Sequence, residues 1–190
     1  MRRGCIKVCL LIGCFMLATL TATAQEVVHA LCGAVRSINS TAKTISVATD
    51  DGSEGLFQDF TKPTVSLDYD KKIRAEATAA DAFTKNGVRV IVYYFGNSDV
   101  RTAVALQDPG TGPFETTIGT VVKFNRKEHV LTLMNKLGVE ETFHLNPKTV
   151  AETAMGAVEG YELDLQVGDQ VRVAASPVNG SESALFIRAL

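Results

Sequence analysis

The stretch Gly119–Leu133 reads GTVVKFNRKEHVLTL, and an earlier stretch, Gly33–Val47, reads GAVRSINSTAKTISV. Placed over each other without a gap, both begin with glycine, share an asparagine, and carry apolar residues at matching positions. The same register continues to Gly52 over Gly138 and Phe57 over Phe143. After a slip of five residues the match resumes, with Gly87 over Gly168, Val90 over Val171, Val92 over Val173, Ala103 over Ala184 and Leu106 over Ile187. The chain therefore contains an internal duplication.

Alternation of apolar and polar side chains predicts short β-strands throughout the first half. The step Asp50-Asp51-Gly52 is typical of a turn between two of them. We interpret it as a solvent-exposed hairpin tip, because it lacks the alternating ligands and the terminal glutamate of a calcium loop. The strands are expected within residues 33–38, 43–47, 56–60, 88–95 and 102–106.

One segment of the first half has helical character. Asp70–Thr84 is rich in alanine and starts with a candidate N-cap, Asp70, so it predicts a helix that ends before Gly87. Three strands, a helix and two more strands is the order of elements in an OB-like barrel, a small closed β-barrel of five strands. An irregular open sheet is the alternative.

The second half repeats the strand pattern after a short linker. Residues 108–115 contain two prolines and two glycines, which favours barrels that touch over widely separated ones. Thr149–Leu163 is interrupted by Gly156 and Gly160, so we expect a loop with one helical turn there. The sequence thus predicts a mainly β protein of two tandem five-stranded OB-like barrels, residues 25–107 and 116–190, with one helix in the first.

Three motifs stand out in the second half: G-x-V before a hairpin, F-x-L-x-x-x-T-x at Phe143–Val150, and V-G-D-x-V-x-V at Val167–Val173. With them the chain resembles the uncharacterised OB-like domains that recur in tandem in exported bacterial proteins. The likeness is looser in the first half, where Asn86-Gly87-Val88 replaces V-G-D. This resemblance implies a fold and an exported location, and it offers no active site to carry over.

Residues 1–24 have the layout of a cleavable secretory signal, with Arg2, Arg3 and Lys7 before an apolar run that begins at Val8. A lipoprotein signal cleaved at Cys14 and a twin-arginine signal are the alternatives. Removing this segment leaves a single cysteine, at position 32, so no disulfide can form within the mature chain. We expect a periplasmic or secreted protein without a transmembrane segment.

The predicted mature chain is acidic. Removal of the three basic residues of the signal leaves 16 Lys and Arg against 21 Asp and Glu. Nucleic-acid binding draws most of its affinity from a basic patch, and no basic run here is longer than two residues, so a nucleic-acid partner is disfavoured. Oligonucleotide binding stays an alternative by analogy with other OB-folds alone. An envelope protein or a glycan is the partner that we consider instead.

Sequence patterns for catalysis and metal binding are absent. The chain has no G-x-S-x-G elbow and no H-E-x-x-H, H-x-H or C-x-x-C spacing. We expect His29, His129 and His144 to have incidental surface roles, Cys32 to be a buried apolar residue, and no cofactor to be bound. The alternative is a small hydrolase or metal-dependent enzyme that uses His129 or His144 with Glu128, Glu140 or Glu141.

The fourth strand differs between the halves. If Val90 and Val92 face the core, the opposite face carries an outer stripe of Arg89, Ile91, Tyr93 and Phe95, whereas the second half has Gln170, Arg172, Ala174 and Ser176 there. An outward aromatic row marks a contact surface. Either the second barrel or the predicted helix covers it, or it binds an external ligand. The sequence therefore predicts a non-enzymatic exported binding or structural module, with this stripe as its candidate contact surface.

Overall fold

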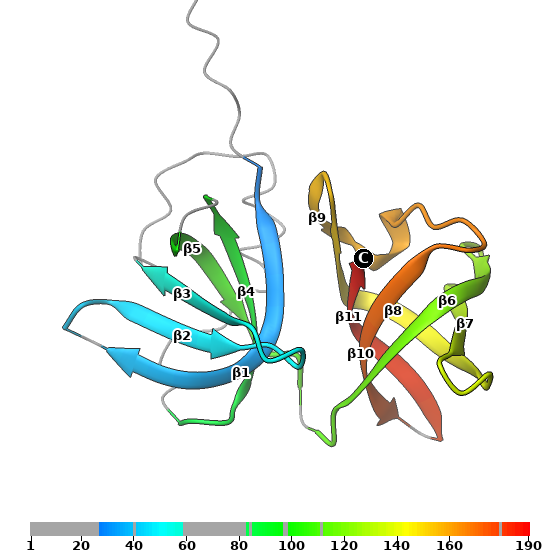
Figure 1. Ribbon diagram of the computed structural model, residues 1–190, viewed down its shortest axis with the longest axis horizontal. Coiled ribbons are helices and arrows are strands. Elements are labelled where there is room, and N and C mark those ends of the chain that lie inside the picture. Colours follow the sequence, from blue (N-terminus) through cyan, green and yellow to red (C-terminus); the bar gives the residue numbers. More distant parts are fainter. Residues whose placement is uncertain are drawn as a thin grey trace, which may run out of the picture.

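The computed structural model describes residues 27–39, 41–58, 83, 85–96, 99–110, 112–178 and 180–190. Two small β-barrels lie side by side, and the chain crosses from one to the other once (Figure 1). The predicted signal segment, residues 1–24, lies outside the described residues, as does the predicted helix Asp70–Thr84 apart from Phe83. The part of the chain that is described contains no α-helix, and none of its helical turns has the length and hydropathy to cross a membrane.

The first barrel closes in the order β1-β2-β3-β5-β4, with β4 pairing back onto β1. All neighbours run antiparallel except β3 and β5, which are parallel. Its strands are β1 (His29–Asn39), β2 (Thr44–Ala48), β3 (Glu54–Gln58), β4 (Arg89–Phe95) and β5 (Val100–Gln107).

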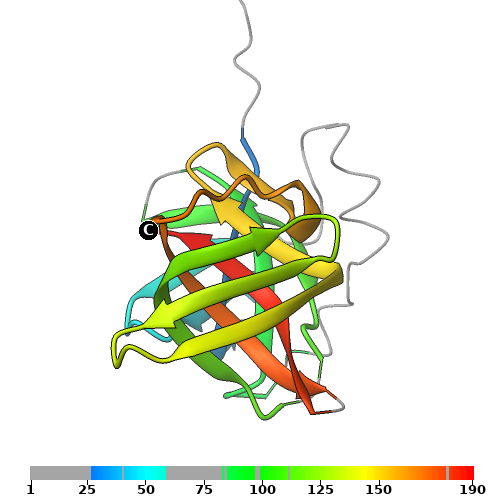
Figure 2. The same ribbon diagram turned by 90° about the vertical axis from the view of Figure 1, so that its right-hand side faces the viewer.

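The second barrel has the same connectivity. Its sheet runs β11-β10-β6-β7-β8-β9, and a parallel pairing of β11 with β8 closes five of these strands into a barrel (Figure 2). Its elements are β6 (Glu115–Asn125), β7 (Val130–Asn135), β8 (Glu140–Thr153), β9 (Gly156–Glu159), the 3-10 turn η2 (Gly160–Glu162), β10 (Gln170–Val178) and β11 (Ser181–Ala189). The predicted class of two five-stranded OB-like barrels is confirmed.

The loop predicted for Thr149–Leu163 is wrong in part. β8 continues to Thr153 and turns back into β9, and only the short turn η2 has the expected helical character. Gly156 adopts a φ of 109°, and the Thr153 hydroxyl donates to its carbonyl at 2.9 Å, so this glycine makes the β8–β9 turn instead of interrupting a strand. Small apolar residues, Ala151 and Ala157, then bury against neighbouring elements.

The duplication holds at the level of single residues. In both β1–β2 and β6–β7 the register shifts at the same repeat position, between Val35 and Ser37 and between Val121 and Lys123. The hairpin residues Lys43 and His129 are also equivalent, and they are the two non-glycine residues with positive φ among those described, at 52° and 57°. The repeat therefore fixes backbone conformation as well as the apolar pattern.

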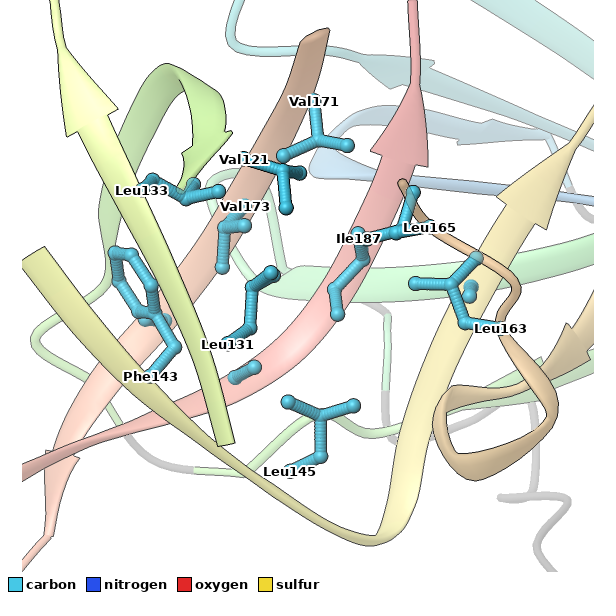
Figure 3. Close-up of a cluster of buried hydrophobic side chains, with 13 residues drawn as sticks. Val121, Leu131, Leu133, Phe143, Leu145, Leu163, Leu165, Val171, Val173 and Ile187 are labelled. Carbon is cyan, nitrogen blue, oxygen red and sulfur yellow. The ribbon is translucent and has the colours of Figure 1, made fainter. Parts of the chain in front are cut away.

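Each barrel has its own apolar core, built from equivalent positions of the repeat. The side chains that were aligned in the sequence point inward in both barrels, and Figure 3 shows this for the second. The paired core residues are Val35 and Val121, Ile45 and Leu131, Val47 and Leu133, Phe57 and Phe143, Val90 and Val171, Val92 and Val173, and Leu106 and Ile187.

Candidate functional site at the junction of the barrels

A third apolar cluster, which we call the junction, joins the two barrels. Its members are Val28, Ala30, Cys32, Ile91, Tyr93 and Ala105 from the first barrel and Val150, Ala157, Ala174 and Phe186 from the second. Two members of the outer stripe, Ile91 and Tyr93, are 0% and 6% exposed within it. The surface that covers these two side chains is therefore the second barrel of the same chain, which is one of the three possibilities that the sequence leaves open.

The junction uses equivalent faces of the two repeats. Tyr93 and Ala174 occupy the same repeat position, and so do Ala105 and Phe186. At each of these positions one barrel carries a large side chain and the other a small one. Close packing needs such complementary volumes. The residue differences between the two halves at these positions therefore allow the two barrels to pack against each other.

Buried polar groups at the junction are satisfied. The Tyr93 hydroxyl donates to Gln107 Oε1 at 2.7 Å, and Gln107 Nε2 donates to the Lys148 carbonyl of the second barrel at 3.3 Å. An unpaired buried amide lowers the stability of the fold by about 1–3 kcal/mol. Because both ends of the Gln107 amide are hydrogen-bonded, this side chain can be buried beside the apolar cluster without that loss.

The other two members of the stripe lie away from the apolar centre. Arg89 forms an ion pair with Asp50, and its guanidinium lies 5.4 Å from the centroid of the Phe114 ring. Phe95 is 8% exposed, and it belongs to none of the three clusters. The structure thus brings Ile91 and Tyr93 together at the junction and places Arg89 and Phe95 elsewhere on the strand.

One edge of the junction is held by the tip of the β2–β3 hairpin. Asp50 accepts hydrogen bonds from Arg89 and, at 2.5 Å, from the Thr116 hydroxyl, while Asp51 forms a 2.5 Å ion pair with Arg172 of the second barrel. Burial works to raise the pKa of Asp50, but the bonds from Arg89 and Thr116 outweigh it and hold that pKa below its usual value. The tip is exposed, as the sequence predicts, and its carboxylates also connect the two barrels.

The opposite edge is held by Glu152. Its Oε1 lies 2.6 Å from His29 Nδ1, and its Oε2 accepts the Ala30 amide at 2.7 Å. Burial raises the pKa of Glu152, although the bonds from Ala30 and His29 and the nearby charge of Arg188 act against it. Next to this contact, the Ala157 amide donates to the Val28 carbonyl at 2.8 Å, so β9 meets the start of β1.

A pocket of about 470 Å³ opens beside Glu152, between the two barrels. We call it the junction pocket. Both barrels contribute charged or polar side chains to its walls, namely His29, Tyr94, Arg101, Glu152 and Arg188. Burial raises the pKa of the Tyr94 hydroxyl, so this group stays protonated and can donate a hydrogen bond. The pocket therefore offers several hydrogen-bond donors and two arginines to a molecule that enters it.

The two histidines considered for catalysis, His129 and His144, do not line this pocket, whereas His29, which is expected to have an incidental surface role, does. His129 is exposed, and its ring centroid lies 4.3 Å from that of Tyr161 with the two rings tilted by 44°; His144 is also exposed. Glu141 accepts hydrogen bonds from Thr117 and Asn135 at 2.6 and 2.5 Å. Among the described residues, no three His, Cys, Asp or Glu side chains form a group that could hold a metal.

Cys32 behaves as the sequence predicts. It is a free, buried cysteine within the apolar cluster of the junction, and burial raises the pKa of its thiol to about 12. The thiolate is the reactive form of cysteine, so this side chain is chemically inert at neutral pH.

Reasoning from the sequence missed the residues that line the junction pocket. Arg101, Glu152 and Arg188 lie on three different strands, and no spacing along the chain connects them. The one available signal was the difference between the two fourth strands, which indicates that an outer face is covered. It does not indicate which groups lie at the edge of the covered area.

Comparisons with known proteins add little to this geometry. No family model and no curated protein sequence matches the chain. The crystal structure of Ag(I)CusF aligns with a TM-score of 0.33 and 13% identity, over 41% of this chain and 99% of that one. The structure of apo-CusF from Escherichia coli aligns with a TM-score of 0.34 and 11% identity, over 43% of this chain and 92% of that one. Similarities this low carry no argument about ligand or location.

Proposed function

We propose that the protein is a non-enzymatic, exported binding module whose two barrels act as one unit and hold their ligand in the junction pocket. The observation that carries this proposal is a pocket of about 470 Å³ that exists only where both barrels meet. Ligand pockets of proteins commonly measure roughly 300–1,000 Å³ and lie at boundaries between domains. The junction pocket fits both descriptions.

The walls of the pocket suit binding better than chemistry. Catalysis by a nucleophile requires an activated hydroxyl or thiol beside a base. The base candidates of the pocket are His29 and Glu152, and they are bonded to each other, while the nearby thiol, Cys32, is buried in the junction. These contacts support a role in fixing the shape of the pocket. A turnover that is abolished by one substitution at His129 or His144 would contradict this part of the proposal.

The pocket can be tested by filling it. The exposed turn residue Ala154 lines it, so Ala154→Trp should block entry. The matched control is Ala42→Trp, which adds the same ring to an exposed hairpin turn of the first barrel. Protein expressed from the full sequence would be equilibrated with the small-molecule fraction of an envelope extract, and retained molecules would be identified by mass spectrometry after gel filtration.

The proposal predicts that the wild type and Ala42→Trp retain the same molecule and that Ala154→Trp loses it while keeping the wild-type melting temperature. Equal retention by Ala154→Trp, or no retained molecule in the wild type, would overturn the assignment of the pocket as the binding site.

A further inference from the structure

We propose that the junction pocket binds a small oxyanion, the carboxylate or phosphate group of a soluble molecule, between Arg101 of the first barrel and Arg188 of the second. This inference rests on the proposed function, because it names the ligand class of the same pocket. It is carried by the way in which the charges around the junction are paired.

Three charged residues form a row across neighbouring strands of the second barrel. Glu152 on β8 pairs in register with Arg188 on β11, and Arg188 pairs with Arg172 on β10. The two outer members have partners on the first barrel, since Glu152 contacts His29 and Arg172 contacts Asp51. Arg188, in the middle, has no ion-pair partner among the described residues. Its guanidinium therefore lies on the wall of the pocket with no ion pair to any described residue, although the charge of Glu152 is nearby.

Arg101 supplies a second positive charge from the first barrel. Its guanidinium carbon lies 5.0 Å from the ring centroid of Tyr94 and 5.9 Å from that of Phe57. Stacking on aromatic rings holds a guanidinium by its face and leaves the N–H donors in its plane available. Within the part of the chain that is described, no carboxylate lies within ion-pair distance of this group.

The acidic residue of the pocket, Glu152, has its charge near that of Arg188 but forms no hydrogen bond with either arginine. Both oxygens of Glu152 are already used, one with His29 and one with the Ala30 amide. Arginine presents paired donors that match the two oxygens of a carboxylate or a phosphate. An oxyanion between Arg101 and Arg188 would be contacted from both barrels, and the Tyr94 hydroxyl, which also lines the pocket, could donate a further bond.

The test compares three sugars of similar size by calorimetric titration of the full-length protein. Glucuronate carries a carboxylate, glucose 1-phosphate carries a phosphate, and glucose carries neither. We expect one or both anions to bind and glucose not to bind. Arg188→Gln and Arg101→Gln should each weaken anion binding about tenfold or more, because each removes a charged hydrogen-bonding group. Arg188→Lys keeps the positive charge but lacks the paired N–H donors of the guanidinium, so it should lose less anion affinity than Arg188→Gln.

The matched control is Arg126→Gln, which removes the same charge from the second barrel. Arg126 is 54% exposed in a hairpin and pairs with Asp164, away from the pocket, so anion binding should not change. Because Arg101 packs on Phe57 of the core, its variant could fail to fold. In that event the variants of the exposed Arg188, compared with Arg126→Gln, decide the test.

Equal binding of glucose and the anions, unchanged binding by Arg188→Gln, or no binding of either anion would overturn the oxyanion assignment. The failure of the proposed function looks different. If Ala154→Trp abolishes retention of the molecule from the extract but neither anion binds, the pocket remains the binding site and only the oxyanion assignment is overturned. If the anions bind equally to the wild type and to Ala154→Trp, both inferences fall.

Discussion

Asp51 makes several contacts at once, and they serve two purposes. Within its own hairpin it accepts hydrogen bonds from the Ser53 hydroxyl and amide and from Thr49, and across the junction it pairs with Arg172. These bonds, those of Ser53 and Thr49 first, hold the pKa of Asp51 well below its usual value. We expect Asp51→Ala to lower the free energy of unfolding at neutral pH by about 1–3 kcal/mol, measured by urea titration.

The effect of Asp51 should depend on pH in a defined direction. A carboxyl whose pKa is lower in the folded state stabilises the fold above its unfolded-state pKa, near 3.8, and loses this contribution as the pH falls further. The difference between wild type and Asp51→Ala should therefore shrink on acidification below about pH 4. A difference that is constant across this range would show that the charge of Asp51 is not what stabilises the hairpin.

Cys32 gives a second prediction at this scale. Its thiol is buried in the junction, with a pKa raised to about 12, so it should resist alkylation by iodoacetamide at mildly basic pH as long as the two barrels stay together. Labelling should become fast in denaturant. The rate can be followed by mass spectrometry, and rapid labelling of the native protein would mean that the junction opens readily.

At the scale of elements, the β8–β9 turn is a contact that should be sensitive to a small change. A Cβ atom on Gly156 would lie 2.5 Å from Val27 Cγ1 and 2.7 Å from the Val28 carbonyl, and its φ of 109° disfavours any side chain. We expect Gly156→Ala to destabilise the protein by about 2–4 kcal/mol and to speed hydrogen exchange at the Ala157 amide, which bonds to Val28.

Gly180→Ala is the matched control for this prediction. Gly180 has a φ of 81° but faces open space, so its substitution carries the conformational cost without the steric clash. Similar losses of stability in the two variants would mean that the approach of β9 to β1 contributes little.

The elements that the sequence predicted well are those that the duplication encodes. The apolar positions of the two halves coincide in the barrel cores, and repeat-equivalent backbone bonds recur: Val35 exchanges bonds with Gly87 and Val88, and Val121 does so with Gly168 and Asp169. The elements it predicted poorly are those that one repeat does not share with the other. β9 was missed because its glycines were read as interruptions, whereas Gly156 makes a turn.

At the scale of the whole molecule, the apolar pattern of a strand indicates that one of its faces is covered. The pattern does not indicate which part of the molecule covers that face. The stripe at Ile91 and Tyr93 was recognised as a contact surface, yet its partner depends on how the two barrels are oriented. That orientation comes from contacts between residues far apart in the chain, such as His29 with Glu152 and Asp51 with Arg172. The junction pocket follows from the same contacts, so it could not be predicted from either half alone.

The central claim is that the two barrels form one unit through the junction, and Phe186→Ala tests it most directly. Truncating this side chain leaves a cavity at the interface with the first barrel, at a cost of about 3–5 kcal/mol. The control is Val139→Ala, on an exposed hairpin of the second barrel. Hydrogen exchange of both variants would be followed by mass spectrometry. The account predicts faster exchange in Phe186→Ala at β1 and β4 of the first barrel as well as at β11, with no such change in the control. Faster exchange confined to the second barrel would contradict it.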